Sequence, residues 1–480
     1  MPIPVISMAQ MREWEKATWA AGRSEADVIR RVGHIIAARA EQMTRPGDLI
    51  LVLAGKGHNG DDARQTSQNL ADREVYLINV AEPEASLSEF LSQLSLQPAL
   101  IVDGLFGIGL NRALDNHWVT LIEQINHSGI PILSIDVPSG LNADTGQPHG
   151  TAIHASVTLT LAAPKRGLLA ASAWPFVGRL EVAPDIGLVS FPLQSRTQWT
   201  TREDFANYPP TRPVAGHKGT FGHLAIFGGS LGYHGAAVLA ARGALRARPG
   251  LVTAFTTEEV YVPVASQLQS AMVQPWQLGK RFADSFTAVL IGPGFASQNL
   301  PSDLKSEMAY LWKELPIPVV ADASGLDWLA SGPIQAKALR VITPHPGEAA
   351  RLLKTTTAAV QESRPETLDQ LSRLFGNCWV ALKGHQSLIG GGGIQEVFVN
   401  SSGNPYLAQG GSGDVLAGYL AGLLAQPQLQ ADPLKALRYS VWQHGAAADL
   451  LSSRQPNWVL DDLLEALGSL PSDDLRRAVL

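Results

Sequence analysis

Cysteine, charged residues and long apolar runs are all scarce in this sequence. Of 480 residues only Cys378 is a cysteine, which excludes an internal disulfide and a thiolate zinc site and favours a reducing, cytoplasmic location. Cys378 lies next to Trp379 in an apolar run and is predicted to be a core residue. No stretch approaches the roughly 18 to 20 consecutive apolar residues that cross a bilayer, so no membrane partner is expected. The first residues also lack the basic and apolar regions of a signal peptide, so export is not expected.

The charge of the chain is low and slightly acidic. Charged residues make up 17% of the sequence, the formal net charge is −6 and the isoelectric point is near 6.1. A nucleic-acid partner would require a basic face, so none is expected. Any phosphate group must therefore be held by local features. The oligomeric state stays open, and a homo-oligomer is compatible with the sequence.

The length of the chain predicts more than one domain. Single hydrophobic cores stop growing at about 250 to 300 residues, so two similar halves are the simplest division of 480 residues. After two amphipathic stretches, apolar runs of strand length alternate with helix-length segments, which predicts an α/β domain with a parallel sheet covered by helices. The expected strands are 49–54, 75–80, 99–103, 130–136, 157–164 and one near 178–182.

A stretch without periodicity separates this half from a second one. Residues 190–220 are rich in Pro, Thr and Gln, and we predict a linker over 196–215 between an N-terminal domain, 1–195, and a C-terminal domain, 216–480. The C-terminal half is also predicted to be α/β, with a small-residue helix around 236–247 and a helix pair from Asp414 onward. Its other segments are 223–229, 251–255, 288–294, 318–322, 341–348 and 379–384.

The glycine-rich segment GNPYLAQGGSGDVLAGYLAGLL is the most informative part of the sequence. Gly410, Gly411 and Gly413 let the backbone approach a phosphate, and the amides that begin the following helix form an anion site. Asp414 stands beside that site, where a carboxylate suits proton transfer from a hydroxyl that attacks a phosphoryl group. The alternative is an Asp that only caps the helix. The three glycines favour the catalytic interpretation.

Three further loops indicate a ligand site in the C-terminal half. HKGTFGHLAIFGGSLGYHGAA places a glycine turn between a strand and a small-residue helix, which suits a flat ligand. In VITPHPGEAARLL, His345 lies between two prolines and is predicted to contact ligand, whereas Glu348 is predicted to cap the helix. In WVALKGHQS a strand ends at Lys383, where an ammonium group can meet phosphates.

Long motifs run through the whole C-terminal half: HKGTFG, GGSLGYHGAAVLAARGAL, IGPGF, TPHPGEAARLL, LKG and GNPYLAQGGSGDVLAG. Together they resemble the family of ADP/ATP-dependent NAD(P)H-hydrate dehydratases, which implies a ribokinase-like fold. The resemblance implies that ADP or ATP phosphorylates the hydroxyl of hydrated NADH or NADPH (NADHX or NADPHX). Phosphate is then expelled by the lone pair of the ring nitrogen. Magnesium is expected with the nucleotide because it commonly bridges phosphate oxygens, although no dedicated ligand set is evident in the sequence.

The resemblance also implies site residues. The implied nucleotide site is Lys383, Gly384, His385, Gln386, Ser387, Gly410, Gly411, Ser412 and Gly413. The implied hydrate site is Ala236, Gly294, His345 and the catalytic Asp414. One loop departs from the family: where relatives tend to read DADAL, this chain reads DASGL from Asp322.

The N-terminal half contains a dinucleotide fingerprint that has two interpretations. GKGHNG matches G-x-G-x-x-G directly after a strand, and Glu82 follows the next strand at about the distance of a ribose contact. This pattern alone predicts a Rossmann dehydrogenase. Asp61 and Asp62 oppose that prediction, because two carboxylates at the helix N-terminus would repel a pyrophosphate.

Three motifs favour another function for residues 1 to about 190: VDGLFGIGLNRAL, IDVPSGLNADTG and LAAPKRGLL. They resemble the NAD(P)H-hydrate epimerase family, a Rossmann-like three-layer domain. The resemblance implies that Asp136 and Lys165 exchange the two epimers, a reaction that needs an acid and a base. It implies a potassium ion attended by Asn59, Asp103 and Ser139. The implied substrate contacts are His58, Asn59, Gly60, Asp61, Asp62, Gly107, Ile108, Gly109, Leu110, Asn111, Arg112, Ala113 and Asp136.

One loop of this half departs from the family pattern. Relatives read GNNGGDG where this chain reads GHNGDDA, so His58, Asp61 and Ala63 replace Asn, Gly and Gly. If the glycine replaced by Asp61 has a positive backbone torsion, aspartate adopts it at some cost, and it adds a charge near bound phosphates. The following segment, ARQTSQNLADRE, lacks the apolar face of a sheet-packed helix. An epimerase site that is weakened or lost therefore stays open.

Three hypotheses follow. The first is a bifunctional enzyme that repairs both epimers of hydrated NADH and NADPH. The second is a kinase of a small hydroxylated metabolite, because the fold alone does not fix the substrate. The third keeps the dehydratase but makes the N-terminal half a binding module without catalysis.

Overall fold

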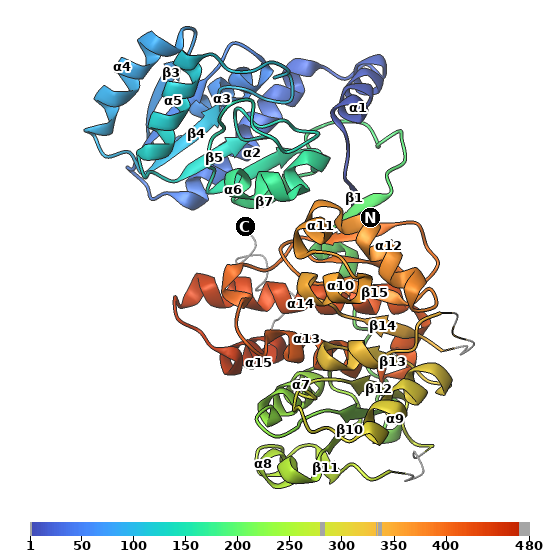
Figure 1. Cartoon of the computed structure of the whole chain (residues 1–480). Helices are drawn as coiled ribbons and strands as arrows, with labels where there is room; N and C mark the ends of the chain where they lie inside the picture. Colours follow the sequence, from blue (N-terminus) through green and yellow to red (C-terminus); the bar gives the residue numbers. More distant parts are fainter. Residues whose placement is uncertain (1, 279–283, 333, 335–337, 470–480) are drawn as a thin grey trace. The chain divides into compact units, whose positions relative to one another are not determined.

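The computed structural model describes residues 2–278, 284–332, 334 and 338–469 (Figure 1). The chain divides into two compact units between Trp199 and Thr200. This division lies inside the linker predicted over 196–215, yet 197–200 form a strand and 202–205 a 3-10 helix. The end of the predicted C-terminal domain, 470–480, lies outside the described residues.

The N-terminal half contains a parallel sheet with the strand order β3-β2-β4-β5-β6-β7. The strands of this half are β1 (Ile3–Pro4), β2 (Leu49–Ala54), β3 (Glu74–Asn79), β4 (Leu100–Gly104), β5 (Ile132–Ile135), β6 (Val157–Leu161), β7 (Arg179–Ala183) and β8 (Thr197–Thr200), with β1 and β8 antiparallel to each other. Its α-helices are α1 (Met8–Ala20), α2 (Glu25–Met43), α3 (His58–Asn69), α4 (Pro83–Leu94), α5 (Asn116–His127) and α6 (Trp174–Val177).

Helices cover both faces of this sheet. Successive residues of a strand point to opposite faces, so each strand contributes to two cores. Val52 of β2 belongs to a core cluster with Ile36 of α2, whereas Leu53 belongs to a cluster with Phe90 of α4. The three-layer α/β arrangement predicted for this half is confirmed.

The C-terminal unit contains a mixed sheet with the strand order β17-β16-β15-β14-β13-β12-β9-β10-β11. The strands from β9 to β15 run parallel, and the hairpin strands β16 and β17 are antiparallel to their neighbours. The strands are β9 (His223–Phe227), β10 (Leu251–Thr256), β11 (Met272–Pro275), β12 (Ala288–Ile291), β13 (Val319–Ala321), β14 (Arg340–Ile342), β15 (Trp379–Leu382), β16 (Leu388–Gly391) and β17 (Val397–Asn400). The α-helices are α7 (His234–Ala247), α8 (Tyr261–Ala265), α9 (Ser302–Glu314), α10 (Pro346–Leu353), α11 (Thr357–Glu362), α12 (Arg364–Leu374), α13 (Ser412–Leu424), α14 (Pro433–Arg454) and α15 (Leu460–Ser469).

Helices α7 and α13 approach each other closely because glycines stand where they meet. A Cβ atom added at Gly418 of α13 would lie 1.9 Å from the carbonyl oxygen of Ala240, and one added at Gly243 of α7 would lie 2.4 Å from that of Val415. The small residues noted in both sequence segments therefore allow backbone-to-backbone packing. This packing holds the N-terminus of α13, the glycine-rich loop and Asp414 in place.

The structure also shows the environment of Cys378 and the character of the helices. Cys378 is buried, with 2% of its surface exposed, as predicted for a core residue. Across the described residues, none of the helices combines the length and the apolar character that a membrane crossing demands.

Replacing Gly418 by alanine should destabilise the C-terminal unit. The added methyl group overlaps the Ala240 carbonyl oxygen at 1.9 Å, and overpacking of this kind costs about 1 to 3 kcal/mol. Differential scanning calorimetry of the full chain should show a lower melting temperature for the C-terminal transition. The matched control is Gly235→Ala in α7, where an added Cβ meets nothing within 4 Å. Equal melting temperatures for the two variants would contradict the close packing.

Candidate functional site

A cleft of about 540 Å³ in the C-terminal unit is lined by loops that follow β14, β15 and β17 and by α13 and α14. Because β14 and β15 are parallel, the loops after them meet at one edge of the sheet, where open α/β sheets bind ligands. The predicted nucleotide residues that line the cleft are Lys383, Gly384, His385, Gln386, Ser387, Ser412 and Gly413. The structure thus brings together two segments that lie far apart in the sequence.

The start of α13 has the geometry of an anion site. Gly411 is the N-cap and has a φ of 99°, a left-handed torsion that favours glycine. A Cβ atom at Gly413 would lie 3.2 Å from Lys383 Nζ, so a side chain there would crowd the ammonium group. Asp414 lies in the first turn of the helix rather than at the cap. The interpretation of Asp414 as a simple helix cap therefore does not hold.

A buried ion pair lies beside this turn. Asp322, directly after β13, accepts a 2.7 Å hydrogen bond from Lys383 Nζ and a 2.8 Å hydrogen bond from Thr343 Oγ1. The side chains of Asp322 and Lys383 are only 2% and 17% exposed. The three residues follow the adjacent strands β13, β14 and β15, which explains why they meet.

The charges of this cluster change the acidity of Asp414. The pKa of Asp414 is raised to about 7: burial has the largest effect, Asp322 and Glu348 also raise the pKa, and Lys383 lowers it. The pKa of Lys383 is itself raised, because three nearby carboxylates outweigh the opposing effect of burial. At neutral pH Asp414 is therefore balanced between a form that accepts a proton and a form that has one.

The loop with His345 and Glu348 forms a capping box at the start of α10. His345 Nδ1 accepts hydrogen bonds from the backbone N–H groups of Gly347 and Glu348, and the Glu348 carboxylate accepts one from His345 N at 2.8 Å. The predicted capping role of Glu348 is confirmed. His345 also lines the cleft. Its ring, held between two prolines, takes part in the cap, and 54% of its side chain remains exposed.

Ala236 and Gly294 lie together near the ends of β9 and β12. A Cβ atom on Gly294 would lie 3.0 Å from the Cβ of Ala236, and Ser230 Oγ donates a 2.7 Å hydrogen bond to the Gly294 carbonyl oxygen. Gly292, two residues earlier, packs against the backbone of Asp322. The predicted hydrate loop thus adjoins the charged cluster.

His444 is a candidate that the sequence did not reveal. It lies on α14, lines the cleft and is 6% exposed. Burial lowers its pKa to about 4, so the ring is neutral at physiological pH. Its Nε2 atom has no hydrogen-bond partner among the described residues. A buried unpaired nitrogen in a cleft wall is rare and indicates a partner supplied by a ligand.

The N-terminal unit has its own cleft, of about 530 Å³. Ten of the residues implied by the epimerase resemblance line it: His58, Asn59, Asp62, Gly107, Ile108, Gly109, Leu110, Asn111, Arg112 and Asp136. Gly60, Asp61 and Ala63 lie in the same loop and helix turn, and Ala113 follows Arg112 directly. The two predicted loops therefore come together around one cavity.

Asp136 and Lys165 form a fully enclosed pair next to this cleft. Lys165 Nζ donates to Asp136 Oδ1 and to the Leu161 carbonyl oxygen, and its side chain is 0% exposed. Asp136 has a φ of 65°, an uncommon torsion for a residue with a side chain, and its Oδ1 also accepts from Leu161 N. Asp136 lines the cleft, and Lys165 lies behind it.

Asp103 and Ser139 form a buried oxygen cluster with Asn59. The Asp103 carboxylate is 0% exposed and accepts hydrogen bonds from Ser134 Oγ and from both the N and Oγ of Ser139. Burial nevertheless raises its pKa. Asn59 Nδ2 donates to the Phe106 carbonyl oxygen at 2.9 Å, which leaves Asn59 Oδ1 on the side toward Gly107. The three implied metal ligands are thus neighbours.

The departures in GHNGDDA are accommodated. Asp61 is helical, in the first turn of α3, so this position requires no positive φ. Its carboxylate accepts a 2.8 Å hydrogen bond from Arg64, which also donates to the Gly55 carbonyl oxygen. Arg64, one turn later, therefore pairs with the added negative charge. Ala63 is fully buried and faces Gly104, where any Cβ would lie only 2.5 Å away.

Helix α3 forms despite its polar sequence. It packs through small surfaces, because Gly33 of α2 lies so close to α3 that a Cβ there would be 2.5 Å from Gln65 Cβ. Thr66 is fully buried and satisfies its hydroxyl by donating to the Asp62 carbonyl oxygen. Helix α3 therefore forms although it lacks an apolar face, because it packs very closely against α2.

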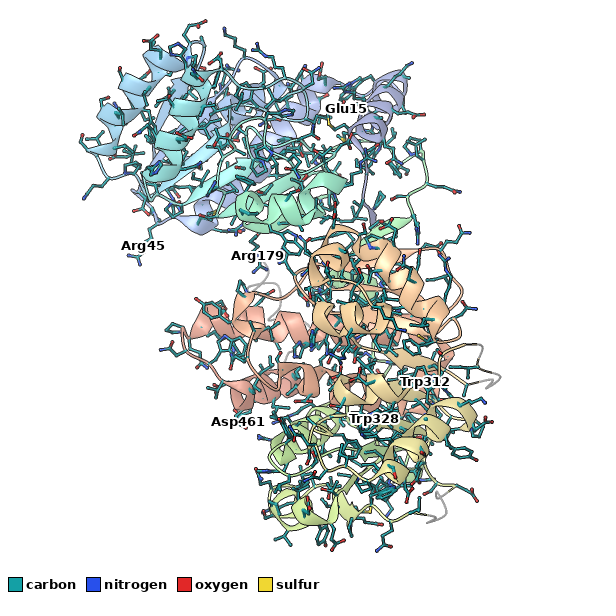
Figure 2. All side chains as sticks on the ribbon, in the orientation of Figure 1. Glu15, Arg45, Arg179, Trp312, Trp328 and Asp461 are labelled. Atoms are coloured by element: carbon teal, nitrogen blue, oxygen red, sulfur yellow. The ribbon has the colours of Figure 1, made fainter. Side chains whose placement is uncertain are left out.

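Two further carboxyl groups face the N-terminal cleft. Asp62 is 7% exposed, and burial, with Asp136, Asp61 and Glu15 nearby, raises its pKa well above the usual range. Glu15, shown on α1 in Figure 2, lines the same cleft, and burial followed by Asp136 raises its pKa. Glu15 belongs to no motif in the sequence, because α1 lies far along the chain from every recognised motif.

Comparisons with known proteins cover both halves. The NAD(P)H-hydrate dehydratase family matches residues 224–468, and the family described as YjeF-related protein N-terminus matches residues 78–167. A bifunctional NAD(P)H-hydrate repair enzyme from Gloeobacter violaceus is 33% identical and covers 97% of this chain and 97% of its own length.

Solved structures were compared as well. An ADP/ATP-dependent NAD(P)H-hydrate dehydratase from Bacillus subtilis, co-crystallised with ATP and Mg²⁺, is 28% identical with a TM-score of 0.47, over 54% of this chain and 91% of its own. A ribokinase-like superfamily protein from Enterococcus faecalis is 23% identical with a TM-score of 0.50, over 60% of this chain and 98% of its own. The predicted ribokinase-like fold is confirmed.

Replacing Asp322 by asparagine should destabilise the C-terminal unit strongly. The change leaves the buried Lys383 ammonium without its 2.7 Å partner, and breaking a buried pair in this way costs about 3 to 5 kcal/mol. Urea unfolding of the full chain, followed by tryptophan fluorescence, measures the loss.

The matched control is Asp327→Asn. Asp327 pairs with Arg351 at 2.8 Å, but these side chains are 40% and 52% exposed, so the loss should stay below about 1 kcal/mol. An equal and small loss of unfolding free energy in both variants would contradict a large contribution of the buried Asp322–Lys383 pair to stability.

Proposed function

The chain belongs to the bifunctional NAD(P)H-hydrate repair enzymes, and from this premise we propose which residues act in each half. The N-terminal half is the epimerase, and the C-terminal half is the dehydratase that depends on ADP or ATP. This function replaces the alternative of a small-metabolite kinase. The substrates are hydrated NADH and NADPH, and the site residues, ions and steps below are proposals.

Asp414 is the base of the dehydratase. Its carboxylate, beside the amides that begin α13, takes the proton of the substrate hydroxyl as the hydroxyl oxygen bonds to the terminal phosphorus of the nucleotide. The bond from that phosphorus to the bridging oxygen breaks, and the shortened nucleotide leaves. The ring nitrogen's lone pair then expels the phosphate as the carbon–oxygen bond breaks, which leaves an iminium. Loss of a proton from the neighbouring ring carbon restores the carbon–carbon double bond of the dihydropyridine. The observation that carries this proposal is the position of Asp414 in the first turn of α13, directly after the glycine turn and beside the buried Asp322–Lys383 pair, and its raised pKa of about 7 agrees with it.

Lys383 and Asp322 are positioning residues for Asp414. Lys383 donates a hydrogen bond to Asp322. Its positive charge lowers the pKa of Asp414, whereas the carboxylate of Asp322 raises that pKa. The pair therefore sets the acidity of the base and also supplies one fixed positive charge beside the phosphates. Because the ammonium is already engaged, the amides of Gly384 to Ser387 and of Gly411 to Gly413 are the principal phosphate donors.

His444 contacts the bound nucleotide. Its Nε2 atom is buried, and its neutral ring can donate or accept one hydrogen bond according to the tautomer. Its place on the cleft wall beside Ser412 supports a contact with the nucleotide.

Magnesium would accompany the nucleotide. No group of three or more His, Cys, Asp or Glu side chains suited to a metal occurs in the described part of the chain. Magnesium commonly binds phosphate oxygens and waters with one or two carboxylates, and Asp322 and Asp414 are the carboxylates near the phosphate site. Such an ion would neutralise charge on the transferred phosphoryl group.

In the epimerase half, Asp136 acts on the ring and Lys165 is its positioning partner. Lys165 donates a hydrogen bond directly to Asp136, whereas burial and three neighbouring carboxylates raise the pKa of Asp62 well above its usual value. One group can therefore take a proton while the other gives one. The proton donor assists departure of the hydroxyl, and the base activates the water that returns to the opposite face of the same carbon.

Potassium fits the cluster of Asn59, Asp103 and Ser139. Oxygen atoms of Asp103, Ser139 and the Phe106 carbonyl meet there, and Asn59 is hydrogen-bonded to the same carbonyl through Nδ2. Asp103 is fully buried without a cationic side chain in contact among the described residues. A buried carboxylate is stabilised by a bound cation. Such an ion would fix the 107–113 loop against the substrate phosphates.

Replacing Asp414 by asparagine should reduce nucleotide-dependent repair by about a hundredfold or more, because general-base catalysis is lost. Recovery of dihydronicotinamide absorbance from hydrated NADH measures the rate. ATP binding, measured by isothermal titration calorimetry, should be largely unchanged. In the wild-type protein, kcat/KM should rise as the pH increases through about 7 and then level off, because only the ionised carboxylate accepts the proton.

Asp461→Asn is the control for this variant. Asp461 is an exposed aspartate, 67% accessible, whose partner Arg242 is also on the surface. It should leave both the rate and the pH profile unchanged. A profile that stays flat from pH 6 to 8, or near-normal turnover by the Asp414 variant, would remove Asp414 from the role of base.

Replacing Asp136 by asparagine should stop enzymatic epimerisation only. With ATP and a mixture of both epimers, the wild-type protein should restore all of the absorbance. The variant should restore the S epimer quickly, and the R epimer should then disappear at its spontaneous rate.

Asp185→Asn, an exposed carboxylate with 78% of its side chain accessible, is the control and should behave as wild type. Replacing potassium by lithium in the buffer should slow only the recovery of absorbance that comes from the R epimer. If wild type already leaves the R epimer behind, the N-terminal half is a binding module without catalysis.

A further inference from the structure

A second cavity in the N-terminal unit, of about 880 Å³, has no role in the function described so far. It is bounded by the segment after β3, by the first turns of α4 and by the start of α5. Lys56, Phe106 and Arg112 line both this cavity and the substrate cleft. The two spaces are therefore neighbours that share a wall.

The order of strands indicates what part of a dinucleotide reaches this cavity. The proposed ring-binding residue Asp136 follows β5, and the proposed phosphate loop 107–113 follows β4. The sheet continues from β4 through β2 to β3 at its edge. A dinucleotide with its damaged ring at β5 and its phosphates at β4 and β2 thus extends its other end toward β3.

The walls of the cavity suit an adenosine group. Phe106 and Trp118 lie with their ring centroids 4.5 Å apart and supply an aromatic surface, and a base stacks on such a surface. Lys56 and Arg112 stand where the cavity meets the cleft, which is where the pyrophosphate would lie. Phe106 thus lies in the shared wall with Lys56 and Arg112, and Trp118 continues the aromatic surface inside the cavity.

Glu82 is the residue that distinguishes an adenosine with a free 2′-hydroxyl group from an adenosine with a 2′-phosphate. It follows β3, precedes α4 as its N-cap and has a side chain that is 77% exposed, with Lys56 Nζ at 3.3 Å. A carboxylate at the end of this strand accepts hydrogen bonds from ribose hydroxyls and repels a 2′-phosphate. Of the other carboxylates in the lining, Asp115 caps α5, and Glu84 stands in the first turn of α4, 3.8 Å from His117, so Glu82 is the one directly at the end of β3.

We propose that this cavity binds the adenosine part of the hydrated dinucleotide and that Glu82 makes the epimerase half prefer NADHX to NADPHX. The proposal rests on the epimerase function and adds the place of the distal substrate half and the residue that selects it. The dinucleotide fingerprint followed by Glu82 is thereby explained without a dehydrogenase.

The test measures epimerisation of R hydrates by the full chain without ADP or ATP, so that the dehydratase half stays idle. The wild-type protein should have a kcat/KM about tenfold higher for NADHX than for NADPHX, as expected for a like-charge contact near solvent. Glu82→Arg should reverse this preference through KM, with kcat unchanged. Hydrated reduced nicotinamide mononucleotide, which lacks the adenosine, should react poorly and equally with both proteins.

Glu89→Gln is the matched control, because Glu89 lies on the same helix, contacts Tyr76 and is outside the cavity lining. It should keep the wild-type preference. An unchanged NADHX to NADPHX ratio in Glu82→Arg, or equal kcat/KM for NADHX and the mononucleotide, would overturn the proposal.

A binding measurement separates this proposal from the epimerase function. Titration calorimetry with ADP-ribose and with 2′-phospho-ADP-ribose compares wild type with Glu82→Arg, and binding to the dehydratase half is the same in both. If no hydrate is epimerised but Glu82→Arg still exchanges the preference between these two probes, the epimerase function fails and the cavity assignment stands. If the probes bind both proteins alike, the cavity assignment fails.

Discussion

A carboxylate enclosed with a lysine at the carboxyl ends of parallel strands is the interaction on which both halves depend. In the C-terminal unit Asp322 follows β13 and meets Lys383 after β15. In the N-terminal unit Asp136 follows β5 and meets Lys165 after β6. Burying either charge alone would cost several kcal/mol. Each pair therefore requires that the strand ends, and with them the ligand loops, stay aligned.

Sequence periodicity predicted the elements that are long or strongly patterned. The alternation of strands and helices, the small-residue helix α7 and the glycine turn before α13 all followed from local signals. The hairpin strands β16 and β17 and the edge strand β11 were not predicted, because short strands rich in glycine or polar residues have no clear period. Strand β8 within the predicted linker was missed for the same reason.

The site was predicted less completely than the fold, because its decisive contacts join distant residues. Lys383 was recognised as a phosphate candidate, but its partner Asp322 lies 61 residues earlier and was noted only as part of an unusual loop. His444 and Glu15 stand on helices without motifs, and only their burial against a cleft distinguishes them. The departure at Asp61 shows the converse, since Arg64 pairs with it from the next turn and a residue-by-residue comparison with a family pattern does not reveal this compensation.

Burial of a carboxyl group gives opposite chemistry in the two clefts because the neighbours differ. Asp414 and Asp62 are both withdrawn from water, which raises the pKa of each. Asp414 has Lys383 nearby, and this positive charge limits the increase to about 7, so the group ionises at neutral pH and serves as a base. The charged neighbours that act on Asp62 are Asp136, Asp61 and Glu15, all negative, so they add to the effect of burial and raise its pKa well above the usual range, which favours the role of an acid. One fold principle, a carboxylate at the start of a helix beside the strand ends, thus supplies a base for phosphoryl transfer and an acid for epimerisation.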